Sequence, residues 1–556
     1  MKVIPPSVTA SREALTFPTL TPAQIAHIAT HGVVRPIERG DVLVEAGDSG
    51  IPFFVVRAGK VEIIRPSDRG DTLVVVHGPG QFTGEANTIA GRRSLTRARV
   101  SESGEAIQLT RDQLLGVVQT DADISEILMR AFIYRRVELA AQGISDVALV
   151  GSVYSAGTLR IKEFLTRNGH PFAYVDLERD TAVQDLLDRF HVAAADIPVL
   201  ICRSTTVLRN PTNQQIADCL GFNEGIDQAH VRDAVIVGAG PAGLAAAVYA
   251  ASEGLDALVI ESNSPGGQAG SSSRIENYLG FPTGISGQEL ASRAYSQAQK
   301  FGAEILIARG AVELACGRKP YEIRIDEGSP VPARTVIIAT GAQYRRPPLE
   351  NLAKFEGAGI YYSATFMESQ LCGGDEIIVV GGGNSAGQAA VFLSQTTRRV
   401  HMLVRSSGLA ESMSRYLVRR IEEIPTIDLR TNTEIVALEG DSHLERVRWR
   451  DNLTGEITSH AIRHVFLMTG AVPNTAWLGG CVALDADGFI KTGPELSQED
   501  LAAARWPLAR SPHLLEASLP GVFAVGDARG GSIKRVASAV GEGSIVISFV
   551  HRALAE

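Results

Sequence analysis

The stretch 231-VRDAVIVGAGPAGLAAAVYAASEGLDALVIES-262 decides the fold of the second half of this 556-residue chain. An apolar run leads into Gly238, Gly240 and Gly243, and a segment of helical length separates them from a second apolar run that ends in Glu261. In a G-x-G-x-x-G loop, one glycine makes a tight turn, one lets a pyrophosphate approach, and one lets the helix pack on the strand. The helix N-terminus attracts the phosphates, and the acid at Glu261 can hold an adenosine ribose hydroxyl. We therefore predict a Rossmann-like unit that binds a dinucleotide.

A second stretch, 376-EIIVVGGGNSAGQAAVFLSQTTRRVHMLVRSS-407, repeats this pattern. Its second strand ends in Arg405 instead of an acid. A guanidinium can pair with a 2′-phosphate, which a carboxylate would repel. We therefore predict FAD in the first unit and NADPH in the second. The expected NADPH-binding residues are Gly381, Gly383, Asn384, Ser385, Ala386 and Arg405.

Five further motifs follow the first loop in order: GGQ (266–268), ENYLGF (276–281), ATGA (339–342), TGAVPNT (469–475) and GVFAVGDA (521–528). Together with the two loops, they make roughly residues 230–556 resemble the low-molecular-weight thioredoxin reductases. The resemblance implies that an FAD domain of residues 230–350 and 475–556 is interrupted by an NADPH domain of residues 351–474. It also implies FAD contacts from Gln268 and Asn277 to the flavin, from Asp527 to the ribityl or pyrophosphate, and from Arg535, Val536 and Ala537 over the isoalloxazine.

The redox thiols of that family are missing. Where those enzymes carry C-A-T-C-D, this chain has Ser363, Ala364, Thr365, Phe366 and Met367. A hydroxyl has no redox couple that could replace a thiolate, so Ser363 and Phe366 cannot form the usual dithiol. Cys372 stands alone nearby, and nothing in the sequence brings it to Cys481; we expect Cys316 to be a strand residue of the FAD domain. No catalytic residue is therefore assigned.

Residues 1–142 predict a β-roll followed by helices, because short alternating apolar runs are broken by Gly-Asp turns. With turn glycines at 40, 47 and 59 and the pair Gly84-Glu85, the segment resembles a cyclic-nucleotide-binding domain. The resemblance implies that Glu85 holds a ribose hydroxyl, but Ser94 occupies the position of the phosphate-binding arginine. Nearby candidates to replace it are Arg92, Arg93 and Arg97. The alternative, which Ser94 favours, is a roll kept for dimerisation or packing with no nucleotide.

Residues 146–226 alternate strand and helix patterns, including a helix predicted over 181–192, and resemble a small thioredoxin or glutaredoxin domain. The resemblance places the cis-proline of that fold at Ile197-Pro198. The positions of the redox pair hold Ser155 and Thr158, so this domain lacks its thiol chemistry. The fold class is therefore multidomain: a β-roll with helices, a small thioredoxin-like α/β domain, and two Rossmann-like α/β domains.

Composition excludes several other classes of protein. The net charge of −9 argues against a nucleic-acid partner. There is no apolar run long enough for a transmembrane helix, and the N-terminal residues lack the apolar core of a signal peptide. Five cysteines are too few and too scattered for a disulfide framework, and no residue cluster has metal-ligand spacing. We expect a cytoplasmic protein with no membrane partner and no metal.

Three functions stay open. The first is an NADPH-dependent FAD oxidoreductase that passes electrons to an acceptor other than its own dithiol: a protein redox carrier, a quinone or dioxygen. The second is a sensor that responds to nucleotide or redox state with little turnover. The third is an adaptor in which the thioredoxin-like domain docks a thiol protein. By analogy with thioredoxin reductases, we expect a homodimer.

Overall fold

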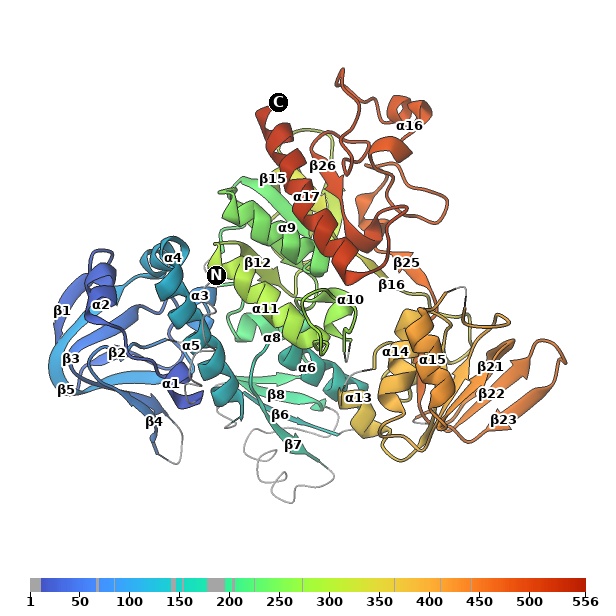
Figure 1. The fold of residues 1–556 in the computed structure, drawn as a ribbon, viewed down its shortest axis with the longest axis horizontal. Coiled ribbons are helices and arrows are strands. Elements are labelled where there is room, and N and C mark those ends of the chain that lie inside the picture. Colours follow the sequence, from blue (N-terminus) through green and yellow to red (C-terminus); the bar gives the residue numbers. More distant parts are fainter. Residues whose placement is uncertain are drawn as a thin grey trace, which may run out of the picture. The chain divides into compact units, whose positions relative to one another are not determined.

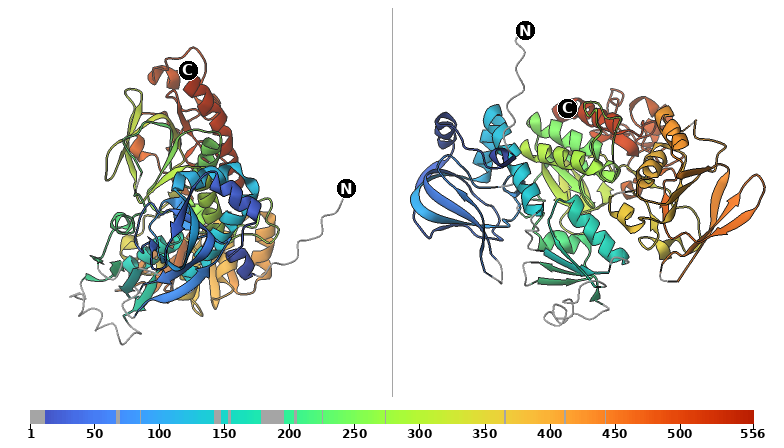
Figure 2. Two further views of the ribbon diagram at one scale, coloured as in Figure 1. Left: turned by 90° about the vertical axis from the view of Figure 1, so that its left-hand side faces the viewer. Right: turned by 60° about the horizontal axis from the view of Figure 1, so that its bottom comes forward.

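The computed structural model describes residues 12–66, 70–84, 86–141, 147–152, 155–177, 196–202, 206–224, 226–272, 274–364, 366–410, 412–441 and 443–556 (Figures 1 and 2). Its internal contacts divide the chain into two units. The first comprises Met1–Gly151, Asn168–Asp227 and Ser296–Ala308, and the second comprises Ser152–Arg167, Gln228–Tyr295 and Arg309–Glu556.

The first unit begins with the predicted roll, a five-stranded antiparallel sheet in the order β1-β5-β3-β4 with β2 on β5. Phe132 from a helix after the roll packs edge-on against Phe53 and Phe82, with ring centroids 6.1 Å away in each case. The sheet and its helices therefore share one core. The elements are α1 (Arg12–Thr16), α2 (Pro22–Ala29), β1 (Val33–Ile37), β2 (Val42–Val44), β3 (Phe53–Arg65), β4 (Thr72–His77), α3 (Ala86–Ala90), β5 (Arg97–Leu109), α4 (Arg111–Thr120) and α5 (Ala122–Ala141).

A four-stranded sheet in the order β7-β6-β8-β9 follows in the same unit. Strands β6 (Val147–Gly151) and β7 (Ala173–Asp176) are parallel, and β8 (Val199–Cys202) runs antiparallel to β6 and to β9 (Thr206–Arg209). The Ile197–Pro198 peptide is cis, and helix α8 spans Asn213–Cys219. Helix α6 (Ala156–Arg167) belongs to the second unit by its contacts. The helix predicted over 181–192 lies outside the described residues.

The first Rossmann-like sheet lies in the second unit, with β11, β10, β15, β14 and β13 as consecutive neighbours and β26 paired to β15. Strand β10 is parallel to β11, as expected of the predicted Rossmann-like unit, and it is also parallel to β15. Helices α9 and α17 lie side by side, and both are labelled in Figure 1. The elements are β10 (Arg232–Val237), α9 (Pro241–Ser252), β11 (Ala257–Glu261), α10 (Gly267–Gly270), α11 (Gly287–Lys300), β12 (Glu304–Ile307), β13 (Ala311–Ala315), β14 (Tyr321–Ile325), β15 (Val331–Ile338), β26 (Val522–Ala524), η4 (Gly526–Ala528) and α17 (Val536–Ala555).

A second parallel sheet, β17-β24-β18-β19-β20, is inserted in sequence between β15 and β26. The chain passes between the two sheets along the antiparallel ribbon of β16 (Ala342–Tyr344) and β25 (Ala471–Pro473). This connectivity is the predicted interruption, and the residue boundaries given above stay predictions. The elements are α12 (Leu352–Phe355), β17 (Ile360–Tyr361), α13 (Phe366–Leu371), β18 (Glu376–Val380), α14 (Asn384–Leu393), β19 (Arg399–Leu403), α15 (Arg415–Glu423), β20 (Ile427–Arg430), β21 (Thr433–Glu439), β22 (Arg446–Asp451), β23 (Ile457–His460), β24 (Val465–Leu467), η2 (Ala476–Leu478), η3 (Gly493–Glu495) and α16 (Gln498–Ala503).

Cys316 and Cys481 form a disulfide across a separation of 165 residues. Our prediction for Cys316 was wrong, because β13 ends at Ala315 and the thiol that follows is bonded to Cys481. The sequence gives no signal for such a pairing, since tertiary structure alone brings the two segments together. A disulfide is uncommon in cytosolic proteins. Cys202, Cys219 and Cys372 are free.

The described residues contain no helix long and apolar enough to cross a membrane. A search of the same residues finds no group of three or more histidine, cysteine, aspartate or glutamate side chains that could hold a metal ion.

The contact between α9 and α17 gives a matched pair of glycine substitutions. A Cβ on Gly543 would lie 2.2 Å from the Ala242 carbonyl oxygen, whereas a Cβ on Gly541 would meet nothing within 4 Å. We expect Gly543→Ala to lower the free energy of unfolding by about 1–3 kcal/mol, because the helices must separate. Gly541→Ala should leave it unchanged or raise it by up to about 1 kcal/mol. Urea unfolding of both variants tests this, and equal effects would contradict the close packing.

Candidate dinucleotide sites and roll pocket

The first glycine loop has the geometry of a phosphate cradle. Gly238 has φ 106° and its N–H donates to the Ile260 carbonyl at 2.8 Å. A Cβ on Gly238 would lie 2.4 Å from the Ala339 carbonyl oxygen, and one on Gly243 would lie 1.8 Å from the Gly238 carbonyl oxygen. Gly240, at the N-cap of α9, has open space around its Cβ position. Two glycines therefore permit the close packing of the loop, and the third leaves room for a ligand at the helix N-terminus.

Glu261 ends β11 and is buried beside this loop. Its carboxylate accepts hydrogen bonds from the backbone N–H groups of Ala239 and Asn263, each at 2.8 Å, and of Ser264 at 3.2 Å. Burial raises the pKa of Glu261, while these N–H groups and the charge of Arg167 oppose the rise. The acid is thus fixed against the loop that would hold the dinucleotide.

The GGQ motif packs against the same loop. The Gly266 N–H donates to the Ala239 carbonyl at 2.7 Å, and a Cβ on Gly267 would lie 3.1 Å from the Cα of Gly240. The Gln268 amide donates to the carbonyl of Ala342, at the start of the ribbon between the sheets. The structure therefore brings Gln268 to the cradle. Asn277 is exposed, and none of the contacts described for it joins it to the cradle.

The GVFAVGDA motif reaches the cradle from the C-terminal end of the chain. A Cβ on Gly526 would lie 3.0 Å from the Cβ of Ala242 in α9, so η4 lies against the start of that helix. The neighbouring Asp527 is partly buried, and burial raises its pKa. The predicted flavin-covering residues are Arg535, which is the N-cap of α17, and Val536 and Ala537, which open that helix.

The ATGA and TGAVPNT motifs meet where the chain crosses between the two sheets. The Thr340 hydroxyl donates to the Asn474 carbonyl at 2.8 Å, and the Asn474 amide donates to the Thr340 carbonyl at 2.9 Å. Two residues that are 134 positions apart in sequence are thus held by a reciprocal pair of hydrogen bonds.

The second glycine loop repeats the geometry of the first. A Cβ on Gly381 would lie 2.3 Å from the Met468 carbonyl oxygen, and a Cβ on Gly383, the N-cap of α14, would meet only the Ser412 carbonyl oxygen at 4.0 Å. Asn384 accepts hydrogen bonds at 2.8 Å from the N–H and the hydroxyl of Ser414. Ala386 is buried, and Ser385 hydrogen-bonds Tyr344. Arg405 follows β19 and is exposed to solvent, where it can meet a phosphate.

The segment that should hold the redox thiols shows no thiol chemistry in its described part. Ser363 is half-buried and Ala364 is buried, while Thr365 and the side chain of Phe366 lie outside the described residues. The Cys372 thiol is buried and donates to the Glu368 carbonyl at 3.1 Å. Burial raises the pKa of Cys372 to about 12, so this thiol stays protonated at neutral pH.

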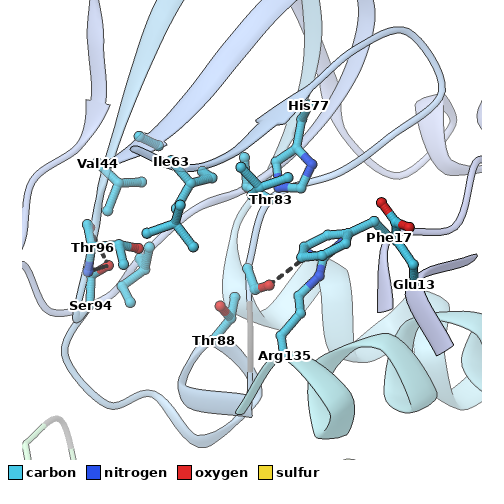
Figure 3. A pocket seen from close by; sticks show the side chains of 15 residues that line it. Glu13, Phe17, Val44, Ile63, His77, Thr83, Thr88, Ser94, Thr96 and Arg135 are labelled. Carbon is cyan, nitrogen blue, oxygen red and sulfur yellow. Dashed lines mark hydrogen bonds between the residues drawn. The ribbon is translucent and has the colours of Figure 1, made fainter. Parts of the chain in front are cut away.

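The roll contains a cavity of about 400 Å³ (Figure 3). Gly84 and Ser94 are among the residues that line it, whereas Glu85 lies outside the described residues. The Ser94 hydroxyl donates to the Thr96 carbonyl at 2.7 Å. The lining residues are Glu13, Phe17, Val44, Ile51, Ile63, Val74, Val75, His77, Thr83, Gly84, Thr88, Ser94, Thr96, Ala98 and Arg135.

The three arginines proposed as substitutes for the phosphate-binding arginine are not among these lining residues. Arg97 pairs with Glu45 at 2.8 Å and with Asp71 at 3.1 Å. Arg93 pairs with Glu224, and Arg92 donates to the Asn168 carbonyl at 3.1 Å and lies over the Phe222 ring. Their guanidinium groups therefore serve packing and ion pairs in the first unit.

Two pocket residues were missed from the sequence. Arg135 of α5 is buried and donates to the carbonyls of Thr16, Phe82 and Gly84. The nearby His77 is 2% exposed, and burial together with the charge of Arg135 lowers its pKa to about 3. The pocket thus presents a neutral imidazole and a cation bound to backbone carbonyls. The helical pattern of α5 predicted only packing, so no sequence signal pointed to Arg135.

Comparison with known proteins agrees with both parts of this geometry. Residues 232–543 match the family described as pyridine nucleotide-disulphide oxidoreductase, and residues 34–121 match the cyclic nucleotide-binding domain. A thioredoxin reductase of Ureaplasma parvum serovar 3 is 32% identical over 57% of this chain and 96% of that protein. One of Treponema pallidum is 33% identical over 56% of this chain and 94% of that protein.

The fold comparison gives the same result. The solved thioredoxin reductase of T. acidophilum superposes with a TM-score of 0.52 at 27% identity, covering 59% of this chain and all of that structure. FAD and NADPH, the cofactors predicted from the two loops, are those of this family, and both glycine cradles fit a dinucleotide. The chain therefore belongs to the pyridine nucleotide-disulphide oxidoreductase family, as a thioredoxin reductase-like flavoprotein oxidoreductase with a cyclic nucleotide-binding domain before it.

Proposed function

We propose that this protein oxidises NADPH through its FAD and delivers the electrons to an external acceptor without an internal dithiol. The observation that carries the proposal is a glycine loop that fits a dinucleotide in each of the two parallel sheets, in a chain whose five cysteines nowhere form a C-x-x-C pair. The acceptor classes are those predicted from the sequence: a protein redox carrier, a quinone or dioxygen.

Bound FAD supplies the hydride and electron chemistry, and the protein supplies position and charge. With FAD bound, the loop of Gly238 and Gly240 would offer backbone N–H groups to its pyrophosphate, and Glu261 would accept an adenosine ribose hydroxyl. Gln268, whose amide binds the Ala342 carbonyl, would contact the flavin; Asn277 is also assigned to the flavin by the resemblance, but none of its described contacts reaches the cradle. Asp527 would hold the ribityl chain or the pyrophosphate. The start of α17, at Arg535, Val536 and Ala537, would cover the ring and exclude water.

The thiol chemistry of the described cysteines supports an external acceptor. Cys372 is buried with a pKa of about 12, so it is a poor nucleophile. Cys316 and Cys481 are bonded to one another, far in sequence from the 363–367 segment. The positions of Ser363 and Phe366 thus end the usual path from flavin to thioredoxin.

A sensor is the second candidate, and the cavity in the roll favours it. Its polar lining and apolar wall suit a small organic ligand, including a cyclic nucleotide. In a sensor, the thioredoxin-like module has Ser155 and Thr158 in place of thiols. It would transmit a conformational signal or dock a partner protein, and it would not take part in thiol exchange. The homodimer and the cytoplasmic location inferred from the sequence are part of the same proposal.

Arg405 should select NADPH over NADH. We expect Arg405→Ala to slow anaerobic flavin bleaching by subsaturating NADPH about 10–100-fold, because a charge-assisted phosphate contact is lost. The rate with NADH should change less than about twofold, since NADH has no 2′-phosphate. Arg399→Ala is the matched control, because Arg399 is exposed at the opposite end of the same strand. Stopped-flow absorbance measures the rates of the natural protein and of both variants with each nucleotide, and equal losses for NADPH and NADH would contradict the role of Arg405.

Without a dithiol, the protein should reduce a small electron acceptor but not a protein disulfide. We expect the protein to reduce ferricyanide with NADPH but to leave the disulfide of a thioredoxin intact, because a flavin without a thiol relay cannot complete the exchange. Cys372→Ala and Cys316→Ser/Cys481→Ser variants should keep the ferricyanide rate. Reduction of thioredoxin that disappears in either variant would restore a dithiol mechanism and overturn the proposal.

The roll should bind cyclic AMP poorly until it regains a cation at position 94. We expect Ser94→Arg to raise the affinity for cyclic AMP about tenfold or more in isothermal titration, because a guanidinium pairs with the cyclic phosphate. Thr72→Arg, which adds the same charge at an exposed site of the roll, is the control. Tight binding to the natural protein with no gain from Ser94→Arg would show that another group holds the phosphate.

A further inference from the structure

Helix α6 lies upstream of the family match, which begins at residue 232, yet its contacts place it in the second unit with the FAD cradle. Its last residue, Arg167, donates from its guanidinium to the Gly267 carbonyl at 2.7 Å. The Gln288 amide, from α11, donates to the Arg167 carbonyl at 3.2 Å. Arg167 therefore fixes the end of α6 to the flavin domain through both its side chain and its backbone carbonyl.

The carbonyl that Arg167 binds belongs to the loop that supports the phosphate cradle. The Gly267 Cβ position lies 3.1 Å from the Cα of Gly240, and the neighbouring Gly266 donates to the Ala239 carbonyl at 2.7 Å. A shift of Gly267 would therefore move the backbone that faces the pyrophosphate. Arg167 therefore contacts the cradle indirectly, through the backbone of Gly267.

Charge gives a second link between Arg167 and the cradle. The Arg167 side chain is 14% exposed, and its pairing with Glu163 at 3.3 Å leaves it close enough to Glu261 to lower the pKa of that acid. Glu261 is buried, so a nearby cation favours its ionised form more than it would in water. The Nε of Arg167 is also buried with no hydrogen-bond partner in the described structure, which leaves it one donor to offer.

We propose that Arg167 is a positioning residue for FAD, supplied by a helix outside the family match, and that the flavin-binding unit of this protein begins at α6. It holds the Gly266–Gly267 loop against the cradle, and its charge favours the ionised form of Glu261, the acid expected to accept the adenosine ribose hydroxyl. The inference rests on FAD binding from the proposed function, but not on the identity of the electron acceptor.

The test measures FAD affinity of the full-length apoprotein by quenching of flavin fluorescence, without NADPH or turnover. We expect Arg167→Met to weaken FAD binding at least tenfold at pH 7, and Arg167→Lys to stay within about threefold of the natural protein, because the cation is kept. Arg293→Met is the control, since Arg293 also forms an i,i+4 pair with a glutamate in the second unit but is 58% exposed.

The pH dependence separates this role from simple packing. Loss of the cation raises the pKa of Glu261 further, so its carboxylate is protonated at a higher pH. The fall in FAD affinity as pH is lowered from 8 to 5 should therefore begin at a higher pH in Arg167→Met than in the natural protein or in Arg167→Lys. The melting temperature of each apoprotein shows whether the fold is kept.

Unchanged FAD affinity in Arg167→Met would overturn the proposal. Equal losses in the Met and Lys variants, with the pH profile unmoved, would also overturn it, because they would show a packing role alone. Failure of the natural apoprotein to bind FAD would instead contradict the proposed function itself.

Discussion

The structure depends on the close approach of one glycine loop to the strand beside it. Gly243 lets α9 begin with its first turn against the carbonyl of Gly238, and Gly238 lets the turn pass the end of β15. Because no side chain fits at these two points, the helix N-terminus is held at the carboxyl end of the sheet, where phosphates bind. The GGQ loop and the start of η4 then pack onto the same place. In the second glycine loop, Gly381 allows the same close approach to the backbone carbonyl of Met468.

In the second unit, the described cysteines leave no free pair for thiol exchange. The segment 363–367 carries no cysteine, and the thiol closest to it in sequence is kept protonated by burial. The remaining pair in the same unit is closed as a disulfide between Cys316 and Cys481. The proposed transfer of electrons to an external acceptor depends on this arrangement of the cysteines. Ser155 and Thr158 stand at the two positions where the sequence resemblance to a thioredoxin domain would place its redox cysteines.

The roll holds a pocket in which Ser94 stands where the resemblance to cyclic-nucleotide-binding domains expects an arginine. Ser94 donates its hydroxyl to a backbone carbonyl, and the neighbouring arginines are used in ion pairs and packing. Arg135 instead enters from the helix, where it binds three carbonyls beside a neutral His77. The charge in the described lining therefore sits on the helix side of the pocket and not on the loop of Ser94. A ligand of this domain must satisfy that arrangement.

The sequence by itself determined the parallel sheets, both glycine loops and the insertion of one Rossmann unit in the other, because these depend on local patterns of apolar runs and glycines. It also predicted the roll, since turns and alternation are local. Tertiary structure alone decided the disulfide between Cys316 and Cys481, the meeting of Thr340 with Asn474, and the approach of Arg167 to Gly267. Each of these contacts joins residues a hundred or more positions apart. Local sequence patterns do not indicate which distant segments will pack together. Contacts of that kind are fixed by packing and charge in three dimensions, and so they appear only once the chain has folded.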